Sequence, residues 1–140
     1  MYKKIDITFL TSCIALLAIF PFECLGEDCW IASEIKGKSA TAFDNYVFTD
    51  NSFKDGMLIC FTDDGGLVTG NDIPLVRFGK STLVGVSITE KGLEVVNTYQ
   101  IDRANRILLI TQSRLGTHTI TTILPDNVSA FAGKVVPAGQ

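Results

Sequence analysis

The chain has 140 residues, of which 46% are hydrophobic and 19% charged, and its net charge at pH 7 is −3. A slightly acidic chain lacks the basic surface that nucleic-acid binding needs, which excludes nucleic acid as the main partner. The length fits a short N-terminal address segment followed by one ordinary domain, and no internal repeat or low-complexity tract divides the chain.

The first predicted element is a secretory signal peptide over residues 1–26. Lys3 and Lys4 provide a positively charged start, and an apolar segment follows over residues 7–22. As a helix, that segment would reach roughly 24 Å, which is short of the ~30 Å hydrocarbon core of a bilayer. We therefore expect a cleaved signal and no stable membrane anchor afterwards. The alternatives are a retained N-terminal anchor and lipid attachment at Cys13.

An export signal places the remaining chain in the periplasm or outside the cell. Cys29 and Cys60 are the two cysteines that remain after cleavage, and an oxidising compartment favours a disulfide between them. In the chain-entropy model such a bond contributes roughly 3–4 kcal/mol. Two cysteines alone do not make a zinc site, and the chain has no CxxC motif for redox chemistry.

Residues 27–140 are predicted to form a single domain of short β-strands. The candidate strands are rich in β-branched and aromatic residues and lie between turn signals of Gly, Asp and Asn. They cover residues 29–35, 45–48, 57–62, 66–69, 73–78, 81–89, 93–101, 106–113 and 117–124. Residues 125–133 are expected to form one helical turn or a loop, and the tail from about residue 134 is expected to be mobile.

The short separators between these segments indicate antiparallel hairpins, since parallel pairing needs a long crossover. A sheet of seven to nine strands must curl or split to bury its apolar face. The sequence therefore predicts an all-β fold, a small antiparallel meander that closes into a barrel or half-barrel, with a β-sandwich as the alternative. In outline this resembles small lipocalin-like barrels, although the Gly-x-Trp signature of lipocalins is absent at Trp30, and no family is identified from the residues.

Period-2 alternation predicts which side chains share a face. In 81–89 the pattern places Val84 and Val86 on one face, and in 93–101 it places Val95 and Tyr99 on one face. A small barrel can enclose one ligand. These four residues are the candidate lining of a ligand cavity, and a solid apolar core without room for a ligand is the alternative.

Residues that could carry catalysis or hold a metal show no informative pattern. The loop aspartates are explained by turn chemistry, because their spacing does not match a calcium-binding loop. His118 is the only histidine, and no nucleophile motif accompanies it. We identify no catalytic residue, no metal site and no cofactor, and a hydrolytic enzyme is the most distant alternative.

The sequence thus predicts an exported β-domain with a non-catalytic binding or protein-interaction role. One version is a barrel that carries a small apolar ligand. The other is a module that binds a protein partner through an exposed apolar patch or an unpaired edge strand. Residues 73–78 are the candidate edge, because Pro74 suggests a strand start or an edge.

Overall fold

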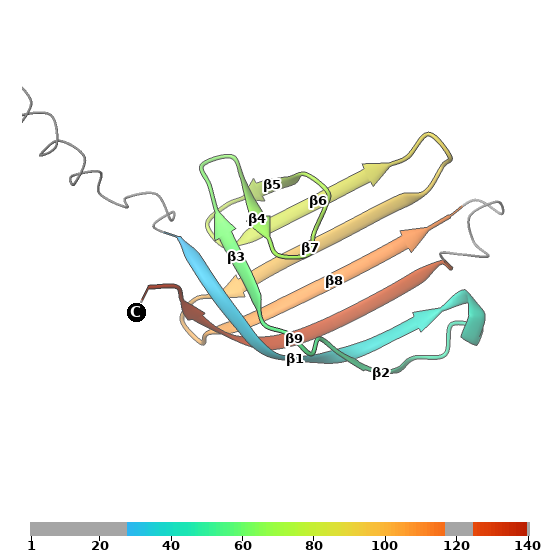
Figure 1. Cartoon of the computed structure of the whole chain (residues 1–140), viewed down its shortest axis with the longest axis horizontal. Coiled ribbons are helices and arrows are strands. Elements are labelled where there is room, and N and C mark those ends of the chain that lie inside the picture. Colours follow the sequence, from blue (N-terminus) through green and yellow to red (C-terminus); the bar gives the residue numbers. More distant parts are fainter. Residues whose placement is uncertain (1–27, 117–124, 140) are drawn as a thin grey trace, which may run out of the picture.

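The computed structural model describes residues 28–116 and 125–139. They form an antiparallel barrel of eight strands plus one additional strand, β2, with almost no helix (Figure 1). The elements are β1 (Cys29–Thr41), the 3-10 helix η2 (Ala42–Asp44), β2 (Thr49–Ser52), β3 (Met57–Phe61), β4 (Gly65–Val68), β5 (Leu75–Phe78), β6 (Thr82–Ile88), β7 (Glu94–Asp102), β8 (Ile107–Leu115) and β9 (Asn127–Pro137). The predicted barrel is confirmed, and the β-sandwich alternative is wrong.

The long strand β1 closes the barrel. One edge of β1 pairs with β9 from Trp30 to Thr41, and the register shifts between Ser33 and Lys36. The other edge pairs first with β3 and then, beyond the register shift, with β2. A shift of this kind bends a strand and increases its twist, which lets β1 serve two neighbours on the same edge.

The strands have unequal lengths, so the two ends of the barrel differ. Strands β3, β4 and β5 have five, four and four residues, whereas β6 to β9 have seven to eleven. The ring is complete at the end where β1 begins, which we call the closed end. Toward the β6–β7 hairpin the longer strands extend beyond β3–β5 as a curved sheet, which we call the open end (Figure 1).

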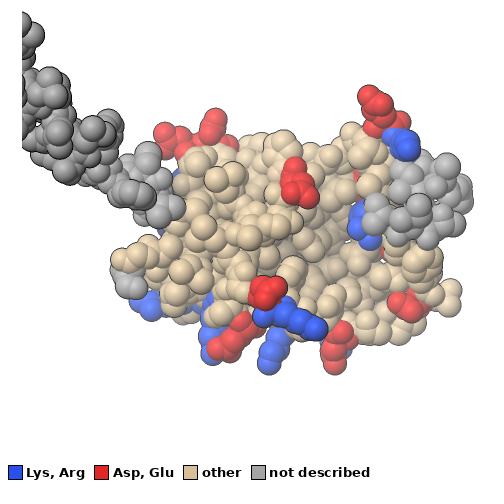
Figure 2. All heavy atoms as spheres, viewed as in Figure 1, with Lys and Arg blue, Asp and Glu red and all other residues tan. Residues whose placement is uncertain are grey.

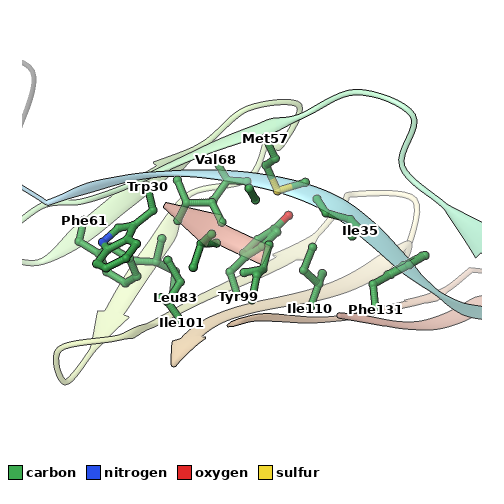
Figure 3. Close-up of a cluster of buried hydrophobic side chains, with 14 of the residues drawn as sticks. Trp30, Ile35, Met57, Phe61, Val68, Leu83, Tyr99, Ile101, Ile110 and Phe131 are labelled. Carbon is green, nitrogen blue, oxygen red and sulfur yellow. The ribbon is translucent and has the colours of Figure 1, made fainter. Parts of the chain in front are cut away.

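A continuous apolar core fills the barrel toward the closed end (Figure 3). Its largest fully buried side chains come from β1, β3 and β6–β9: Ile35, Ile59, Leu83, Tyr99, Leu108, Ile110 and Val135. Full burial of such a side chain contributes about 1.5–3 kcal/mol. Phe53 packs edge-on against Phe131, with ring centroids 4.8 Å apart, and caps the core on the side of the β2–β3 loop.

The face of β6 is the opposite of the predicted one. Leu83 and Gly85 point into the barrel, whereas Val84 and Val86 lie on the outer face, where Val86 is 59% exposed. The segment is apolar on both faces, so alternation alone could not choose between them. Gly85 suits its inward-facing position, because a Cβ there would lie 2.8 Å from the side chains of both Ile73 and Leu75.

Three further expectations about local structure are wrong. Residues 45–48 belong to a loop and β2 begins at Thr49. Strand β5 is not an edge, because it pairs with both β4 and β6, although Pro74 directly precedes its first residue, as the strand-start alternative expects. Residues 127–137, expected as a turn or loop followed by a mobile tail, form β9, which pairs with β1 and β8. The predicted strand 117–124 lies outside the described residues. Within the described part, no helix is long and apolar enough to cross a bilayer.

Candidate binding site at the open end of the barrel

The inner surface of the barrel changes from apolar to polar toward the open end. Four residues stand opposite one another on neighbouring strands: Asn97 of β7, Gln112 of β8, Ser129 of β9 and Ser39 of β1. Asn97 is two residues from the buried Tyr99, and side chains two residues apart share a face of a strand. These four residues, the polar row, therefore face the barrel interior.

Tyr99 marks the boundary between the apolar core and the polar row. Its side chain is 2% exposed, and its hydroxyl lies 3.5 Å from Asn71 Oδ1 and within hydrogen-bonding reach of Gln112. Burial raises the pKa of Tyr99, which keeps the phenol neutral, and the Gln112 contact offsets part of this effect. Asn71 Oδ1 also accepts a hydrogen bond of 3.0 Å from Asn97 Nδ2. The β4–β5 loop, which carries Asn71, is thus tied to the polar row.

Two hollows at the open end share Gln112 in their lining. The first has a volume of about 290 Å³ and the second about 240 Å³. The first is lined by Phe53, Lys54, Asp55, Gly56, Met57, Thr69, Gly70, Tyr99 and Gln112. The second is lined by Leu93, Val95, Asn97, Gln112, Ser113, Arg114 and Asn127. Each alone is near the lower limit of about 300 Å³ for small-molecule sites, and Gln112 is common to both.

The charged side chains that line the hollows come from Arg114, which is already hydrogen-bonded, and from a loop at the edge of the first hollow. Arg114 donates from Nε and Nη2 to the carbonyl oxygen of Pro125, at 3.1 and 3.0 Å. Lys54 and Asp55 line the first hollow from the β2–β3 loop. Figure 2 shows mostly uncharged residues over the middle of the face seen in Figure 1, where an acidic side chain also stands, with the other charged residues along the margins. The polar row itself carries only neutral groups. Its two serine hydroxyls are already hydrogen-bonded to Asn51 and Asn127, which leaves the amides of Asn97 and Gln112 beside the hollows.

The β1–β2 loop adds large apolar side chains at the same end of the barrel. More than half of each side chain is exposed for Phe43, Tyr46, Val47 and Phe48. Tyr46 has a positive φ of 59°, a conformation that costs a non-glycine residue about 1–2 kcal/mol. It is held by a backbone hydrogen bond to Thr41 and a hydroxyl contact to Asp126. The loop is therefore a fixed apolar part of the rim.

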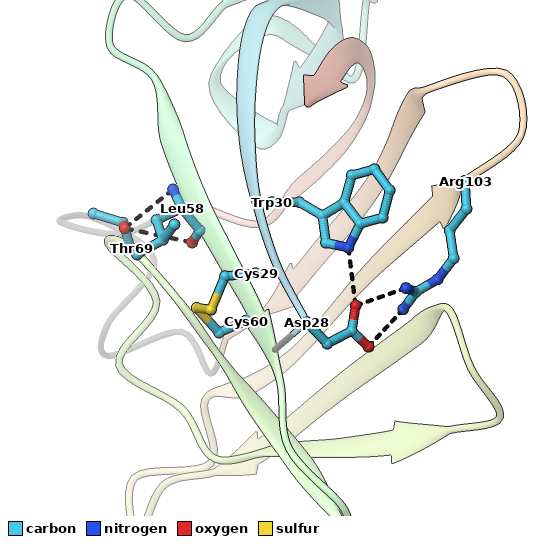
Figure 4. Close-up of a disulfide and its surroundings, with 7 residues drawn as sticks. All are labelled: Asp28, Cys29, Trp30, Leu58, Cys60, Thr69 and Arg103. Atoms are coloured by element: carbon cyan, nitrogen blue, oxygen red, sulfur yellow. Dashed lines mark hydrogen bonds and ion pairs between the residues drawn. A yellow bond between two sulfur atoms is a disulfide. The ribbon is translucent and has the colours of Figure 1, made fainter. Parts of the chain in front are cut away.

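An ion-pair cluster lies at the closed end, and its charged groups bind one another and do not form a binding site. The Asp28 carboxylate accepts hydrogen bonds from Arg103 Nη1 at 2.6 Å, Arg103 Nη2 at 2.8 Å and Trp30 Nε1 at 3.0 Å (Figure 4). Arg77 Nη2 lies 3.4 Å from the same carboxylate. The Arg103 guanidinium also lies over the rings of Trp30 and Phe61, at 5.3 and 5.1 Å. These contacts bind the start of β1 to strand β5 and to the β7–β8 turn.

The charge state of Asp28 follows from these contacts. The hydrogen-bonded Arg103 guanidinium holds the pKa of Asp28 below its ordinary value, although partial burial opposes the shift. The carboxylate is therefore charged at neutral pH and its bonding capacity is used within the fold. In the described residues, no buried side-chain nitrogen or oxygen lacks a partner.

The predicted disulfide is confirmed. Cys29 of β1 stands directly opposite Cys60 of β3, with an S–S distance of 2.07 Å (Figure 4). The bond lies beside the ion-pair cluster, because Asp28 precedes Cys29 and its carbonyl accepts from the Phe61 amide at 2.9 Å. The first residues of the barrel are thus held to β3 by the disulfide and to Arg103 by the Asp28 ion pair.

Of the four predicted lining residues, the structure places two at the open end. Tyr99 lines the first hollow and Val95 the second, whereas Val84 and Val86 lie on the outer face and line neither. Asn97 shares the predicted inward face of β7 with Val95 and Tyr99, so its position was readable from the alternation. His118 lies outside the described residues. Among the residues described, no group of three or more His, Cys, Asp or Glu side chains could hold a metal ion.

Comparison of the sequence with protein-family models, with curated proteins and with solved structures gave no match.

Proposed function

We propose that this protein is an exported, non-catalytic binding protein that takes a small, uncharged polar molecule at the open end of its barrel. The observation that carries this proposal is the pair of neutral amides in the polar row, Asn97 and Gln112, which line the two hollows. Such groups fix the orientation of a ligand through hydrogen bonds, while Phe53 and Met57 offer it an apolar wall.

The interior favours a polar ligand over the small apolar ligand expected from the sequence. The apolar part of the barrel is occupied by its own side chains, including the fully buried Leu83, Leu108 and Ile110. An apolar molecule at the open end would instead cover Asn97 and Gln112. Each buried amide group left without a hydrogen bond costs about 1–3 kcal/mol, which opposes apolar binding there.

Two features support export. The Cys29–Cys60 disulfide suits an oxidising compartment, the periplasm or the extracellular space. The sequence of residues 1–26 has the charged start and short apolar segment of a secretory signal.

The binding proposal is tested by NMR titration of the ¹⁵N-labelled protein with neutral probes, namely monosaccharides, polyols and nucleosides. We expect a binding probe to shift the side-chain amide signals of Asn97 and Gln112 and to leave that of Asn105, at the β7–β8 turn, unchanged. Gln112→Leu should abolish the shift of the Asn97 side-chain amide. Gln100→Leu, a matched change on the outer face of β7, should not.

Titration with a long-chain alcohol or fatty acid tests the alternative, which is a small apolar ligand. If only these apolar probes bind, and Gln112→Leu strengthens their binding, the polar-ligand proposal is wrong.

A further inference from the structure

The last part of strand β6 pairs with a neighbouring strand on one side only. The strand pairs with β7 from Thr82 to Ile88, but its pairing with β5 ends at Gly85, opposite Leu75. Residues 86–88 therefore have a neighbouring strand on one side only. This stretch is a free edge of the sheet at the open end.

The residues of β6 that bond to β7 alternate along the strand, and this alternation decides which backbone groups face the free edge. The Thr89 amide donates to Leu93 and the Ile101 amide donates to Ser81, so the odd-numbered residues of β6 exchange their hydrogen bonds with β7. In a strand the N–H and C=O groups of successive residues point to opposite sides. The backbone groups of Val86 and Ile88 therefore point to the free edge, and within residues 28–116 and 125–139 no hydrogen bond to them is formed from that side.

The free edge of β6 is also unprotected by charge. The other free edge of the sheet is β2, where Asp50 forms an ion pair with Lys38 of β1 at 3.1 Å. Strand β6 has no charged residue. On its outer face Val86 is 59% and Ile88 70% exposed. Edges with exposed apolar side chains and no charge are the ones that pair with other strands.

We propose that two copies of this chain pair through this edge, β6 against β6, antiparallel about a two-fold axis at Ser87. The segment is self-complementary in this arrangement. Val86 of each copy stands opposite Ile88 of the other, so their unpaired N–H and C=O groups form four hydrogen bonds. The exposed Val86 and Ile88 side chains meet across the seam.

A second copy fits this edge because the register about Ser87 is self-complementary and the strand carries no charge that would face itself across the seam. The net charge of −3 on each chain weakens the association but does not act at the seam. The seam is short, because β5 flanks the strand from Gly85 backward and the β6–β7 turn follows Ile88. The expected dimer is therefore weak and depends on concentration.

The test is sedimentation equilibrium of the mature, disulfide-bonded protein over about a hundredfold range of concentration. We expect the mass to rise from one chain toward two. Val86→Lys should weaken dimerisation at least about tenfold, because each lysine places a charged group against the apolar Ile88 of the other copy and removes the valine contact there. Leu109→Lys is the matched control: Leu109 is 47% exposed on the outer face of β8, and its substitution should leave dimerisation unchanged.

Amide hydrogen exchange provides a readout at the seam itself. The amides of Val86 and Ile88 should become protected as the concentration rises, whereas that of Ser87, which faces β7, should be protected throughout. A single-chain mass at every concentration would overturn the proposal. So would a dimer that Leu109→Lys dissociates and Val86→Lys does not, because the interface would then lie on the outer face of the barrel.

Discussion

Replacing Asp28 by Asn should destabilise the barrel strongly, because it removes the one carboxylate at the centre of the closed-end cluster. The side chain of Asp28 is 24% exposed, and those of Arg77 and Arg103 are 19% and 32% exposed. Hydrogen bonds to charged groups contribute about 1.5–3 kcal/mol each when well shielded. Asp28 accepts two from Arg103, and Asn can replace only part of this pattern. We therefore expect a loss of about 2–3 kcal/mol.

The effect of Asp28→Asn should depend on pH in one direction. The pKa of Asp28 is lowered in the fold, so its charge stabilises the protein above the unfolded-state pKa of about 3.9. That stabilisation is lost as the pH falls through the lowered pKa. The difference in unfolding free energy between wild type and variant should thus be constant from about pH 5 to 7 and shrink in stronger acid.

The assay is denaturant unfolding of both proteins with the disulfide intact, at several pH values. Asp50→Asn is the matched control, because the Asp50–Lys38 pair is exposed and its loss should cost at most about 1 kcal/mol. Equal losses in the two variants at pH 7 would refute the reasoning. A difference that persists below the lowered pKa would also refute it, because both side chains are then neutral.

Three other sets of substitutions test the apolar core and the Cys29–Cys60 disulfide. Leu83→Ala should cost about 2–5 kcal/mol and Val84→Ala less than about 1.5 kcal/mol in denaturant unfolding, and the reverse order would show that the assigned face of β6 is incorrect. Replacing Cys29 and Cys60 by Ala should lower the unfolding free energy by about 3 kcal/mol, and an unchanged midpoint would mean that the bond does not form. Tyr99→Phe should cost about 1 kcal/mol through its lost hydroxyl contacts, and a more stable variant would show that the hydroxyl is not satisfied in the fold.

The sequence predicted most strands of the barrel, and its errors have identifiable physical causes. Strand β7 was assigned to the correct face because Tyr99 and Ile101 alternate with polar residues. Strand β6 was assigned to the wrong face because its apolar residues occupy both faces, and the close packing of Gly85 against Ile73 and Leu75 is visible only in the fold. Strand β9 was missed because Gly and Ala dilute its pattern, and its pairing with β1 is visible only in the fold.

The two ends of the barrel were predictable to different degrees. The disulfide followed from simple elimination among four cysteines. The ion-pair cluster could not be predicted, because Asp28 lies 49 residues from Arg77 and 75 from Arg103. At the open end the β7 pattern contained Asn97, but its partner Asn71 lies on a loop without periodicity.

The most direct test of binding at the open end is the native mass of the mature protein purified from its own host, compared with its denatured, unreduced mass. We predict an additional native mass that equals a small neutral polar molecule, absent in Gln112→Leu and retained in Gln100→Leu. An apolar molecule that remains bound in Gln112→Leu, or a wild-type protein that carries no added mass and binds no neutral polar probe, would contradict the account.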